Sequence, residues 1–334
     1  MILLERINKK YSKGVTAIDG INLQISGGSI VAIIGANGSG KSTLLKIIAG
    51  QVKPSQGKVS TFGCNTIQPH SSLKNKTTYI SQEKNLDPEM TGMELLQYFS
   101  ALYGLSGKFA RQNIMSLIDN FSMKTFVHRK VSGYSGGQKQ RLHIAVGVIH
   151  NPELLLLDEP GSALDPEGKA LIWNFICRSQ QQGSTTIIVD HDLESIRQHC
   201  TRVILLDQGH IIADDTPAAI IKKYSKPLLQ FTTQYCLATM QPLVEFCHKQ
   251  WPDSHLSFNN TLTTLKFSDI SEKDRPTIML KLLQFFYNNH IVVTECFWHQ
   301  PGLAAAYFQL TGKKADKPPQ NQNKHQKRTK GRRH

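Results

Sequence analysis

A glycine-rich segment near the N-terminus has the residue types and the spacing needed to bind phosphate. It reads GANGSGKST at 35–43 and follows the short apolar run 29–34, which predicts a buried strand. Glycine lets the backbone turn tightly, so successive N–H groups can face phosphate oxygens, and a helix expected at 43–49 would direct its N-terminus at the anion. We expect Lys41 to place its charge on the outer phosphates and Ser42 to offer a hydroxyl to Mg2+. The residues predicted to bind nucleotide here are Gly35, Asn37, Gly38, Ser39, Gly40, Lys41, Ser42 and Thr43.

Two acidic residues follow a second apolar run. Four leucines at 154–157 predict a buried strand of an α/β domain, and Asp158 and Glu159 stand at its carboxyl end, where such sheets bind ligands. Asp158 is suited to hold Mg2+ through its water shell, and Glu159 can polarise an attacking water as a general base. The alternative is a strand that ends in two solvated acids. The phosphate loop upstream favours the catalytic interpretation.

A Ser-Gly-Gly turn predicts a second phosphate-binding helix N-terminus. YSGGQ at 134–138 precedes a helix expected at 138–150, so it offers N–H groups and a hydroxyl. A chain with one phosphate loop does not need a second cradle for its own nucleotide. We therefore expect this turn to close on the γ-phosphate of a nucleotide held by a partner chain, although a plain helix cap would give the same pattern. The residues assigned to this cradle are Ser135, Gly136, Gly137 and Gln138.

The order of these motifs resembles that of the nucleotide-binding subunit of an ABC transporter. The resemblance covers residues 1–224, and it continues in SALD at 162–165 and in a histidine after the strand expected at 185–189. It implies an α/β fold, a P-loop NTPase cassette with a RecA-like core and a helical subdomain at about 83–150. It also implies ATP and Mg2+ as cofactors and a second ABC cassette as partner, with a homodimer expected.

The resemblance assigns four more residues. Tyr11 is similar to the aromatic residue that stacks on adenine, and Asp165 is similar to the aspartate that communicates across the dimer. Gln82 resembles the glutamine that reaches Mg2+ and the attacking water. His191 resembles the switch histidine that contacts the γ-phosphate and helps to orient Glu159 and water. The resemblance thus gives Glu159, His191 and Gln82 as catalytic residues and Ser42, Gln82 and Asp158 as metal ligands.

Two residues depart from the family pattern. Tyr134 replaces the leucine that is more usual before Ser-Gly-Gly-Gln, but the Ser and both Gly residues are intact, so we expect activity to survive. Asp190 stands where a Ser or Thr often precedes the switch histidine. We expect its carboxylate, near the γ-phosphate region, to alter the charge of His191 or the rate of hydrolysis.

Residues 225–312 predict a second, smaller α+β domain. The expected order of elements is β-α-β-β-α-β, which is typical of a ferredoxin-like sandwich. Asn259 and Asn260 predict a hairpin turn, and Ser271 predicts the capping box of a helix. The expected strands are 228–233, 255–258, 262–267 and 291–298, and the expected helices are 237–249 and 271–289.

The segment 301–312 resembles the closing segment of ATPases in the drug, polysaccharide and lipid exporter branch. Ala304 and Ala305 depart from the acidic residues that are usual there. Membership of another ABC branch, or a terminal amphipathic helix of no special kind, remains an alternative. The residues that match are Leu303, Phe308, Leu310, Thr311 and Gly312.

Composition limits the class of protein. A length of 334 residues suits about two domains. No segment approaches the roughly 18 apolar residues of a membrane span, and the first residues do not form a signal peptide. We therefore expect a cytoplasmic protein, peripheral on the cytoplasmic face of the inner (plasma) membrane, whose pore is another subunit. The six cysteines show no metal-like spacing and are expected to be reduced.

The last residues, 313–334, form a basic tail. They contain nine Lys or Arg and one Asp, a net +8 of the chain's formal +14, and they are rich in Pro, Gln and Asn, so we expect disorder. The tail is a solvated segment, or it is attracted to an anionic membrane surface by about 1 kcal/mol per basic residue. Contact with nucleic acid is a third interpretation, which the absence of aromatic residues disfavours.

The sequence as a whole predicts an ATP hydrolase subunit that dimerises around two ATP molecules and drives a separate transmembrane permease, for export of a drug, lipid or polysaccharide. A second hypothesis is a non-transport ABC ATPase that acts on nucleic acid or the ribosome. The basic tail supports it, but such proteins usually carry two cassettes, and a second phosphate loop is absent here. A third hypothesis is an ATP-dependent regulator whose C-terminal domain senses a ligand.

Overall fold

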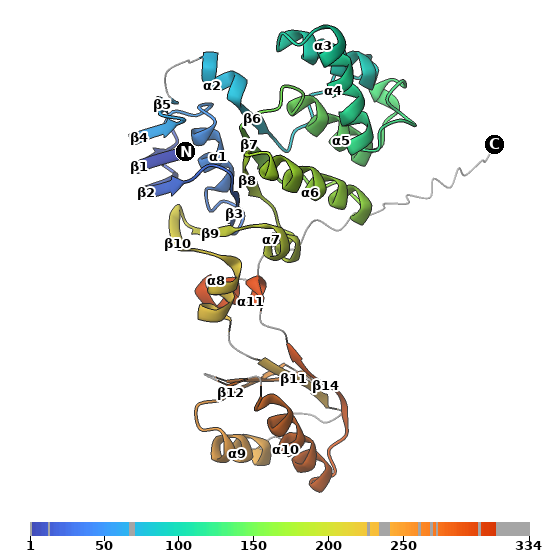
Figure 1. Cartoon of the computed structure of the whole chain (residues 1–334). Coiled ribbons are helices and arrows are strands. Elements are labelled where there is room, and N and C mark those ends of the chain that lie inside the picture. The colour runs from blue at the N-terminus through green and yellow to red at the C-terminus, as the bar shows by residue number, and fades with distance from the viewer. Residues whose placement is uncertain are drawn as a thin grey trace, which may run out of the picture.

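The computed structural model (Figure 1) describes residues 2–12, 14–66, 71–225, 228–233, 241–259, 262–267, 270–271, 273–299 and 302–311. The predicted turn residue Asn260, the start of the helix expected at 237–249 and the whole basic tail lie outside these ranges. Within the described ranges, no helix is long and apolar enough to cross a membrane.

A six-stranded sheet forms the centre of the N-terminal part of the chain. Its order is β10-β9-β3-β8-β7-β6, in which β10 is antiparallel to β9 and the other neighbours are parallel. Val31 and Ile33 of β3 face one hydrophobic core, and Ala32 and Ile34 face another. Both faces are therefore covered, which explains the unbroken apolar runs of the central strands. The bounds are β3 Ile30–Ile34, β6 Thr77–Ile80, β7 Leu154–Asp158, β8 Thr185–Val189, β9 Arg202–Asp207 and β10 His210–Asp215.

An antiparallel sheet and the helix α1 cover one face of the central sheet (Figure 1). The order of this second sheet is β2-β1-β4-β5. Leu44, Leu45 and Ile47 of α1 are fully buried in the core between the sheets. The bounds are β1 Ile2–Lys10, β2 Thr16–Ile25, β4 Gln56–Thr61, β5 Cys64–Asn65, α1 Lys41–Ile48 and α2 Ser71–Lys76.

Helices cover the opposite face, and α3 (Gly92–Leu102) and α4 (Gly107–Asn120) stand apart from the sheet in a helical subdomain (Figure 1). The predicted α/β fold, with a RecA-like core and a helical subdomain, is confirmed. The helix expected at 138–150 starts earlier, at Gly136, because Ser135 caps it, and it ends at Gly147. The bounds are α3 Gly92–Leu102, α4 Gly107–Asn120, a 3-10 turn Val131–Gly133, α5 Gly136–Gly147, α6 Pro166–Gln181, α7 Leu193–His199 and α8 Pro217–Tyr224.

A smaller antiparallel sheet follows α8. Its order is β12-β13-β11-β14, with α9 and α10 on one face, which is the arrangement of a ferredoxin-like sandwich (Figure 1). The buried side chains of Phe231, Leu265 and Phe286 join the sheet to α10. The bounds are β11 Leu228–Thr233, α9 Gln241–Gln250, β12 His255–Asn259, β13 Leu262–Lys266, α10 Arg275–Asn288 and β14 Val293–His299.

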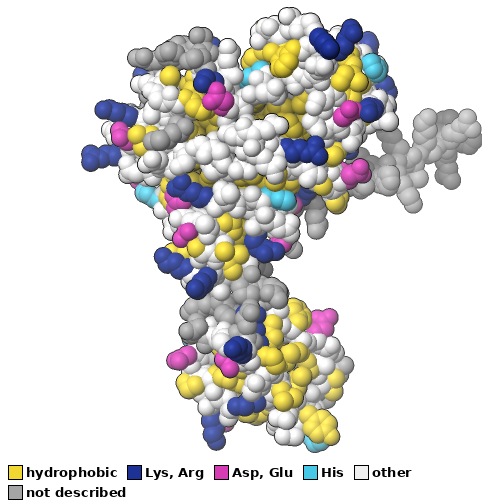
Figure 2. Space-filling view, viewed as in Figure 1, with side chains coloured by type: hydrophobic (Ala, Val, Ile, Leu, Met, Phe, Trp, Pro, Cys, Tyr) yellow, Lys and Arg dark blue, Asp and Glu magenta, His cyan; other side chains and the backbone are white. Residues whose placement is uncertain are grey.

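The helix α10 differs from the helix expected at 271–289. It begins four residues later, at Arg275, and no side chain caps it. The Ser271 hydroxyl donates to the Asp274 carboxylate at 2.8 Å instead of accepting from a backbone N–H, so the predicted capping box does not form. On its outer side α10 exposes Leu280 and Tyr287, and Figure 2 shows apolar side chains on the surface of this part of the chain.

The last described helix, α11 (Leu303–Thr311), packs against α7 and α8 rather than on the small sheet (Figure 1). Leu303, Ala306 and Tyr307 are buried in the core that covers the central sheet. The chain therefore leaves the N-terminal part after α8, forms the small sheet, and returns. Residues 225–312, expected as one domain, include a helix that contributes to the core of the other.

The return of α11 gives a prediction about stability. Tyr307 is 1% exposed, whereas its neighbour Phe308 is 39% exposed. We expect Tyr307→Ala to lower the free energy of unfolding by about 3–5 kcal/mol, because it leaves a large cavity, and Phe308→Ala to lower it by less than about 1 kcal/mol. Urea denaturation followed by circular dichroism measures both. Equal effects of the two substitutions would contradict the packing of α11.

Candidate active site

The phosphate loop joins β3 to α1, and its glycines are required by its backbone. Gly38 and Gly40 have φ angles of +81° and +107°, in the left-handed region that favours glycine. A side chain on Gly35 would collide with the carbonyl of Leu206, and one on Gly40 would collide with the carbonyl of Ala17. The loop therefore keeps a tight path that larger residues would open.

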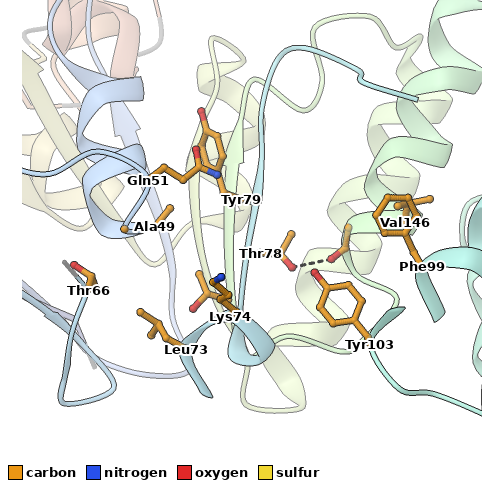
Figure 3. Close-up of a pocket in the computed structure, with 13 residues that line it drawn as sticks. Ala49, Gln51, Thr66, Leu73, Lys74, Thr78, Tyr79, Phe99, Tyr103 and Val146 are labelled. Atoms are coloured by element: carbon orange, nitrogen blue, oxygen red, sulfur yellow. Dashed lines mark hydrogen bonds between the residues drawn. The ribbon is translucent and has the colours of Figure 1, made fainter. Parts of the chain in front are cut away.

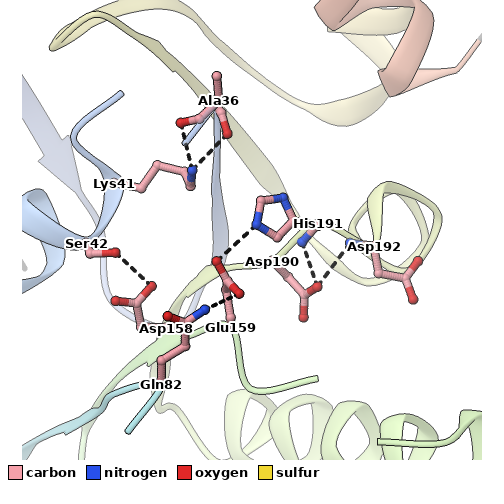
Figure 4. Close-up of polar contacts among 10 residues, drawn as sticks. Ala36, Lys41, Ser42, Gln82, Asp158, Glu159, Asp190, His191 and Asp192 are labelled. Carbon is pink, nitrogen blue, oxygen red and sulfur yellow. Dashed lines mark hydrogen bonds and ion pairs between the residues drawn. The ribbon is translucent and has the colours of Figure 1, made fainter. Parts of the chain in front are cut away.

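The Lys41 ammonium lies inside this loop. It donates to the carbonyl oxygens of Gly35 and Ala36 at 2.8 and 3.0 Å, and the residue is 6% exposed (Figure 4). A buried ammonium at the N-terminus of α1 places positive charge where the helix dipole also favours an anion. This arrangement suits a phosphate group.

Asp158 ends β7 as a buried carboxylate with two hydroxyl partners. The Ser42 hydroxyl donates to Oδ1 and the Tyr79 hydroxyl donates to Oδ2, both at 3.1 Å. Asp158 is 6% exposed. Burial and the Asp158 charge together raise the pKa of Tyr79 well above its ordinary value of 10.0, so the hydroxyl keeps its proton.

Tyr79 is not among the site residues that the sequence predicts. Tyr79 lies on β6, which pairs with β7 in parallel, so it stands beside the strand that ends at Asp158. The four leucines predict the strand at 154–157, but nothing in the sequence gives its pairing with β6, so no signal in the sequence brings Tyr79 to this carboxylate.

Glu159 lies between two side chains that come from other strand ends (Figure 4). The Gln82 amide donates to its Oε2, and His191 Nε2 lies 3.0 Å from its Oε1. Glu159 has a φ of +52°, unusual for this residue type, and its N–H donates to the Val189 carbonyl at 2.8 Å. The strand end thus holds the carboxylate in a constrained backbone position, as functional sites often do.

Electrostatics in this pair favour an ion pair. The hydrogen bond with His191 lowers the pKa of Glu159 from its ordinary 4.5, although burial opposes the shift. The same hydrogen bond raises the pKa of His191 from its ordinary 6.5. Both shifts favour a Glu159 carboxylate beside a charged imidazole.

This pair predicts a stability that depends on pH. The lowered pKa of Glu159 stabilises the fold above pH 4.5, and this stabilisation is lost as pH falls through the folded-state pKa of Glu159. The raised pKa of His191 stabilises the fold below pH 6.5, and this stabilisation is lost as pH rises through the folded-state pKa of His191. We expect His191→Gln to lower the melting temperature more at about pH 5.5 than at about pH 9. Differential scanning calorimetry at both values tests this. A difference that does not change with pH would contradict the ion pair.

A cavity of about 660 Å3 brings most of the predicted residues together. Tyr11 stands at its rim, 42% exposed, with its hydroxyl 3.4 Å from Thr43 Oγ1. The size and the mixed polarity suit a nucleotide. The lining residues are Tyr11, Val15, Ala17, Asn37, Gly38, Gly40, Lys41, Ser42, Thr43, Gln82, Glu159 and His191.

Two predicted loop residues support the cavity without lining it. Gly35 supplies a carbonyl to Lys41, and Ser39 is buried, with its N–H donating to the Ala36 carbonyl at 3.1 Å. They hold the shape of the loop.

The second cradle does not line this cavity. Ser135 caps α5, since its hydroxyl accepts from the Gln138 N–H at 3.2 Å while the Gln138 side chain accepts from the Ser135 N–H at 3.1 Å. Asp165 caps α6 by accepting from the Gly168 N–H at 2.8 Å. Within one chain the cradle is a helix cap.

Both residues that depart from the family pattern make hydrogen bonds within this chain, and the charge of Asp190 also adds to the raised pKa of His191. Tyr134 is buried and its hydroxyl donates to the Phe126 carbonyl at 2.7 Å. Asp190 Oδ1 accepts from the N–H groups of His191 and Asp192 at 2.7 and 3.0 Å, so it fixes the turn after β8 (Figure 4). Burial is the main reason that the pKa of Asp190 is raised.

The oxygen-bearing side chains at this site fit Mg2+. Ser42 and Gln82 line the cavity, and Ser42 contacts the buried Asp158. Within the described ranges no group of three or more His, Cys, Asp or Glu residues is arranged to hold a metal. Mg2+ commonly binds through one or two carboxylates together with substrate phosphates, so this donor set suits it.

Comparisons with known proteins agree with this geometry. Residues 18–162 match the family model described as ABC transporter. Over 216 residues the chain is 33% identical to the ABC transporter ATP-binding protein NatA of Bacillus subtilis, covering 64% of this chain and 88% of that protein. The chain belongs to the ABC transporter ATP-binding proteins. This ABC ATPase is thus an ATP-binding, ATP-hydrolysing transporter subunit.

Two further comparisons describe the relatives. The ABC ATPase is 26% identical over 317 residues to the linearmycin resistance ATP-binding protein LnrL of Bacillus subtilis, covering 94% of this chain and 99% of that protein. It is also similar to a solved ATP-binding cassette, a dimer in a post-hydrolysis state bound to ADP and Pi, at 30% identity and a TM-score of 0.59, covering 65% of this chain and 98% of that one. These relatives do not favour the hypothesis of a non-transport ATPase.

Proposed function

We propose that two copies of this chain bind two ATP molecules between them, and that hydrolysis drives a separate transmembrane permease that exports its substrate. The observation that carries the proposal is the division of the predicted residues. Lys41, Ser42, Gln82, Glu159 and His191 line one cavity, whereas the Ser-Gly-Gly cradle at the start of α5 does not. A second copy supplies the missing cradle.

In this proposal the residues of the site bind the nucleotide, activate the attacking water or hold Mg2+. Lys41 and the loop N–H groups bind the β- and γ-phosphates, and the exposed ring of Tyr11 stacks on adenine. Glu159 takes a proton from the attacking water, while Gln82 and His191, which already contact it, hold water and carboxylate in line. Ser42, Asp158 and Gln82 would hold Mg2+, which would supply positive charge beside the phosphate oxygens.

The second copy completes the site from the other side. The Ser135 hydroxyl and the N–H groups of Gly136 and Gly137 bind the γ-phosphate of the partner's ATP, and Gln138 and Asp165 lie next to this contact. The helix dipole of α5 adds positive potential at the same point. ATP therefore favours the closed dimer, and hydrolysis reopens it.

Export is supported by the relatives. The names of LnrL, of a doxorubicin resistance protein DrrA of Mycobacterium tuberculosis and of a Nod factor export protein of Burkholderia orbicola refer to resistance or to export. We therefore place this ATPase on the cytoplasmic face of the inner (plasma) membrane, bound to a permease that exports a drug, lipid or polysaccharide.

Affinity purification from membranes tests the partner. The full chain, tagged and solubilised in mild detergent with ATP, should carry a multi-span membrane protein that mass spectrometry identifies. Ribosomal proteins or nucleic acid in place of such a protein would contradict the transport proposal.

The basic tail is accessory in this proposal. Deleting residues 313–334 should leave the turnover of ATP in solution within about twofold of the full chain, because every proposed site residue lies before residue 192. Phosphate release measures this, and sedimentation with vesicles that contain anionic lipid measures whether the tail binds a membrane surface. Loss of turnover in the truncated chain would show that the tail acts at the site.

A further inference from the structure

Tyr79 lies between the active site and a second cavity. This cavity, of about 510 Å3, is bounded by the ends of α1 and α5 and by α2, β6 and α3 (Figure 3). In the space-filling view the surface is hollowed between the two upper lobes (Figure 2). Gln51, Tyr79 and Tyr103 are among its lining residues. One side of the Tyr79 ring thus faces this cavity, while its hydroxyl reaches Asp158.

The position of Tyr79 follows from the pairing of two parallel strands. Tyr79 of β6 pairs with Leu156 of β7, two residues before Asp158, so a long side chain directed along the strand reaches the carboxylate. The same strand is tied to α5 on the other side, because the Thr78 hydroxyl donates to the Gly147 carbonyl at 2.7 Å. The strand that carries Tyr79 is therefore held by β7 and by α5, and its hydroxyl is held by Asp158.

The two hydroxyl groups that donate to Asp158 differ in their relation to the proposed Mg2+ site. Ser42 donates to Oδ1, and its oxygen is one of the proposed Mg2+ ligands, so this hydroxyl would contact both the ion and the carboxylate. Tyr79 donates to Oδ2 and lies on the far side, in the wall of the second cavity. Its hydrogen bond can stay in place and keep the carboxylate from rotating.

We propose that Tyr79 is a positioning residue that holds the Asp158 carboxylate in the orientation that binds Mg2+. This inference rests on the proposed role of Asp158 toward Mg2+. Groups that orient a metal ligand from behind typically contribute about 10–100-fold to metal affinity. Tyr79 acts only through Asp158, so its loss should affect the metal-dependent part of nucleotide binding and leave the rest unchanged.

The test measures how much Mg2+ strengthens nucleotide binding. A fluorescent, non-hydrolysable ATP analogue is titrated into the full chain in excess Mg2+ and in EDTA, and the ratio of the two dissociation constants gives the gain. Tyr79→Phe should reduce this gain by about tenfold and change the affinity in EDTA by less than about twofold. Tyr103→Phe is the matched control, because Tyr103 lines the same cavity but is not one of the hydroxyl partners of Asp158. Burial alone raises the pKa of Tyr103, with no contribution from the Asp158 charge.

Two more variants separate the possible outcomes. Tyr79→His, whose ring N–H can donate, should recover part of the gain. Asp158→Asn should lose the gain in affinity that Mg2+ gives. If this variant keeps the gain, Asp158 does not hold the metal, and the role that the proposed function gives to Asp158 is wrong. If Asp158→Asn loses the gain while Tyr79→Phe keeps it, or if Tyr79→Phe and Tyr103→Phe lose it equally, the inference about Tyr79 is overturned and the role of Asp158 stands.

Discussion

Replacing Glu159 with Gln should reduce ATP turnover by about 100-fold to 10,000-fold while ATP binding is kept. Gln has nearly the same shape as Glu, so its contacts with Gln82 and His191 need little rearrangement. It cannot take a proton from water, because an amide oxygen is a very weak base. The bound ATP then stays intact, and the two copies that it joins stay closed.

Two measurements check this outcome together. Phosphate release gives the turnover, and light scattering after size exclusion in Mg2+ and ATP gives the mass, which should be that of a dimer. Glu153→Gln is the control, since Glu153 is an exposed acid just before β7 that pairs with Lys76 and should not affect turnover. Normal turnover in Glu159→Gln would show that Glu159 is not the general base.

Replacing Gly136 with Asp should abolish turnover without harming the fold. A Cβ on Gly136 meets no atom within 4 Å, and a negative charge in the first turn of α5 stabilises the helix by about 0.3–1 kcal/mol. The same charge would face the γ-phosphate of the partner's ATP, and the loss of this contact should cost about 100-fold or more in turnover.

This prediction separates the two interpretations of the Ser-Gly-Gly turn. If the turn were only a helix cap, Gly136→Asp would be neutral or slightly stabilising. Gly133→Asp is the control, because its Cβ also has open space and it lies before the cap. Normal turnover in Gly136→Asp, with an unchanged melting temperature, would leave the cradle without a role in hydrolysis.

The chemistry-bearing residues were predictable because strand ends determine their position. Asp158, Glu159 and His191 follow buried apolar runs, and the carboxyl ends of parallel strands meet at one edge of a sheet, so these side chains converge. The order of elements in the small domain was also predictable, since alternating apolar and polar residues indicate strands and turn residues separate them. What each residue does there remains a proposal.

Contacts that depend on tertiary packing could not be predicted. Tyr79 reaches Asp158 only because β6 pairs with β7, and α11 packs on α8 only because the chain returns after the small sheet. Asp190 is a different case, because it accepts hydrogen bonds from the N–H groups of the next two residues and so fixes a local turn, while its charge adds to the raised pKa of His191. For Tyr79 and α11 the residue types were visible in the sequence, but their partners were set by elements distant in the sequence.

The central claim is that each ATP site is built from two copies of the chain, and mixing two inactive variants tests it most directly. Lys41→Ala disables the phosphate loop of one copy, and Gly136→Asp disables the cradle of the other. In a mixed dimer one site combines the intact loop and the intact cradle. Combining the two inactive proteins should therefore restore turnover, up to about a quarter of wild type when half of the dimers are mixed. No recovery at any mixing ratio, when light scattering shows that dimers form, would contradict the shared site.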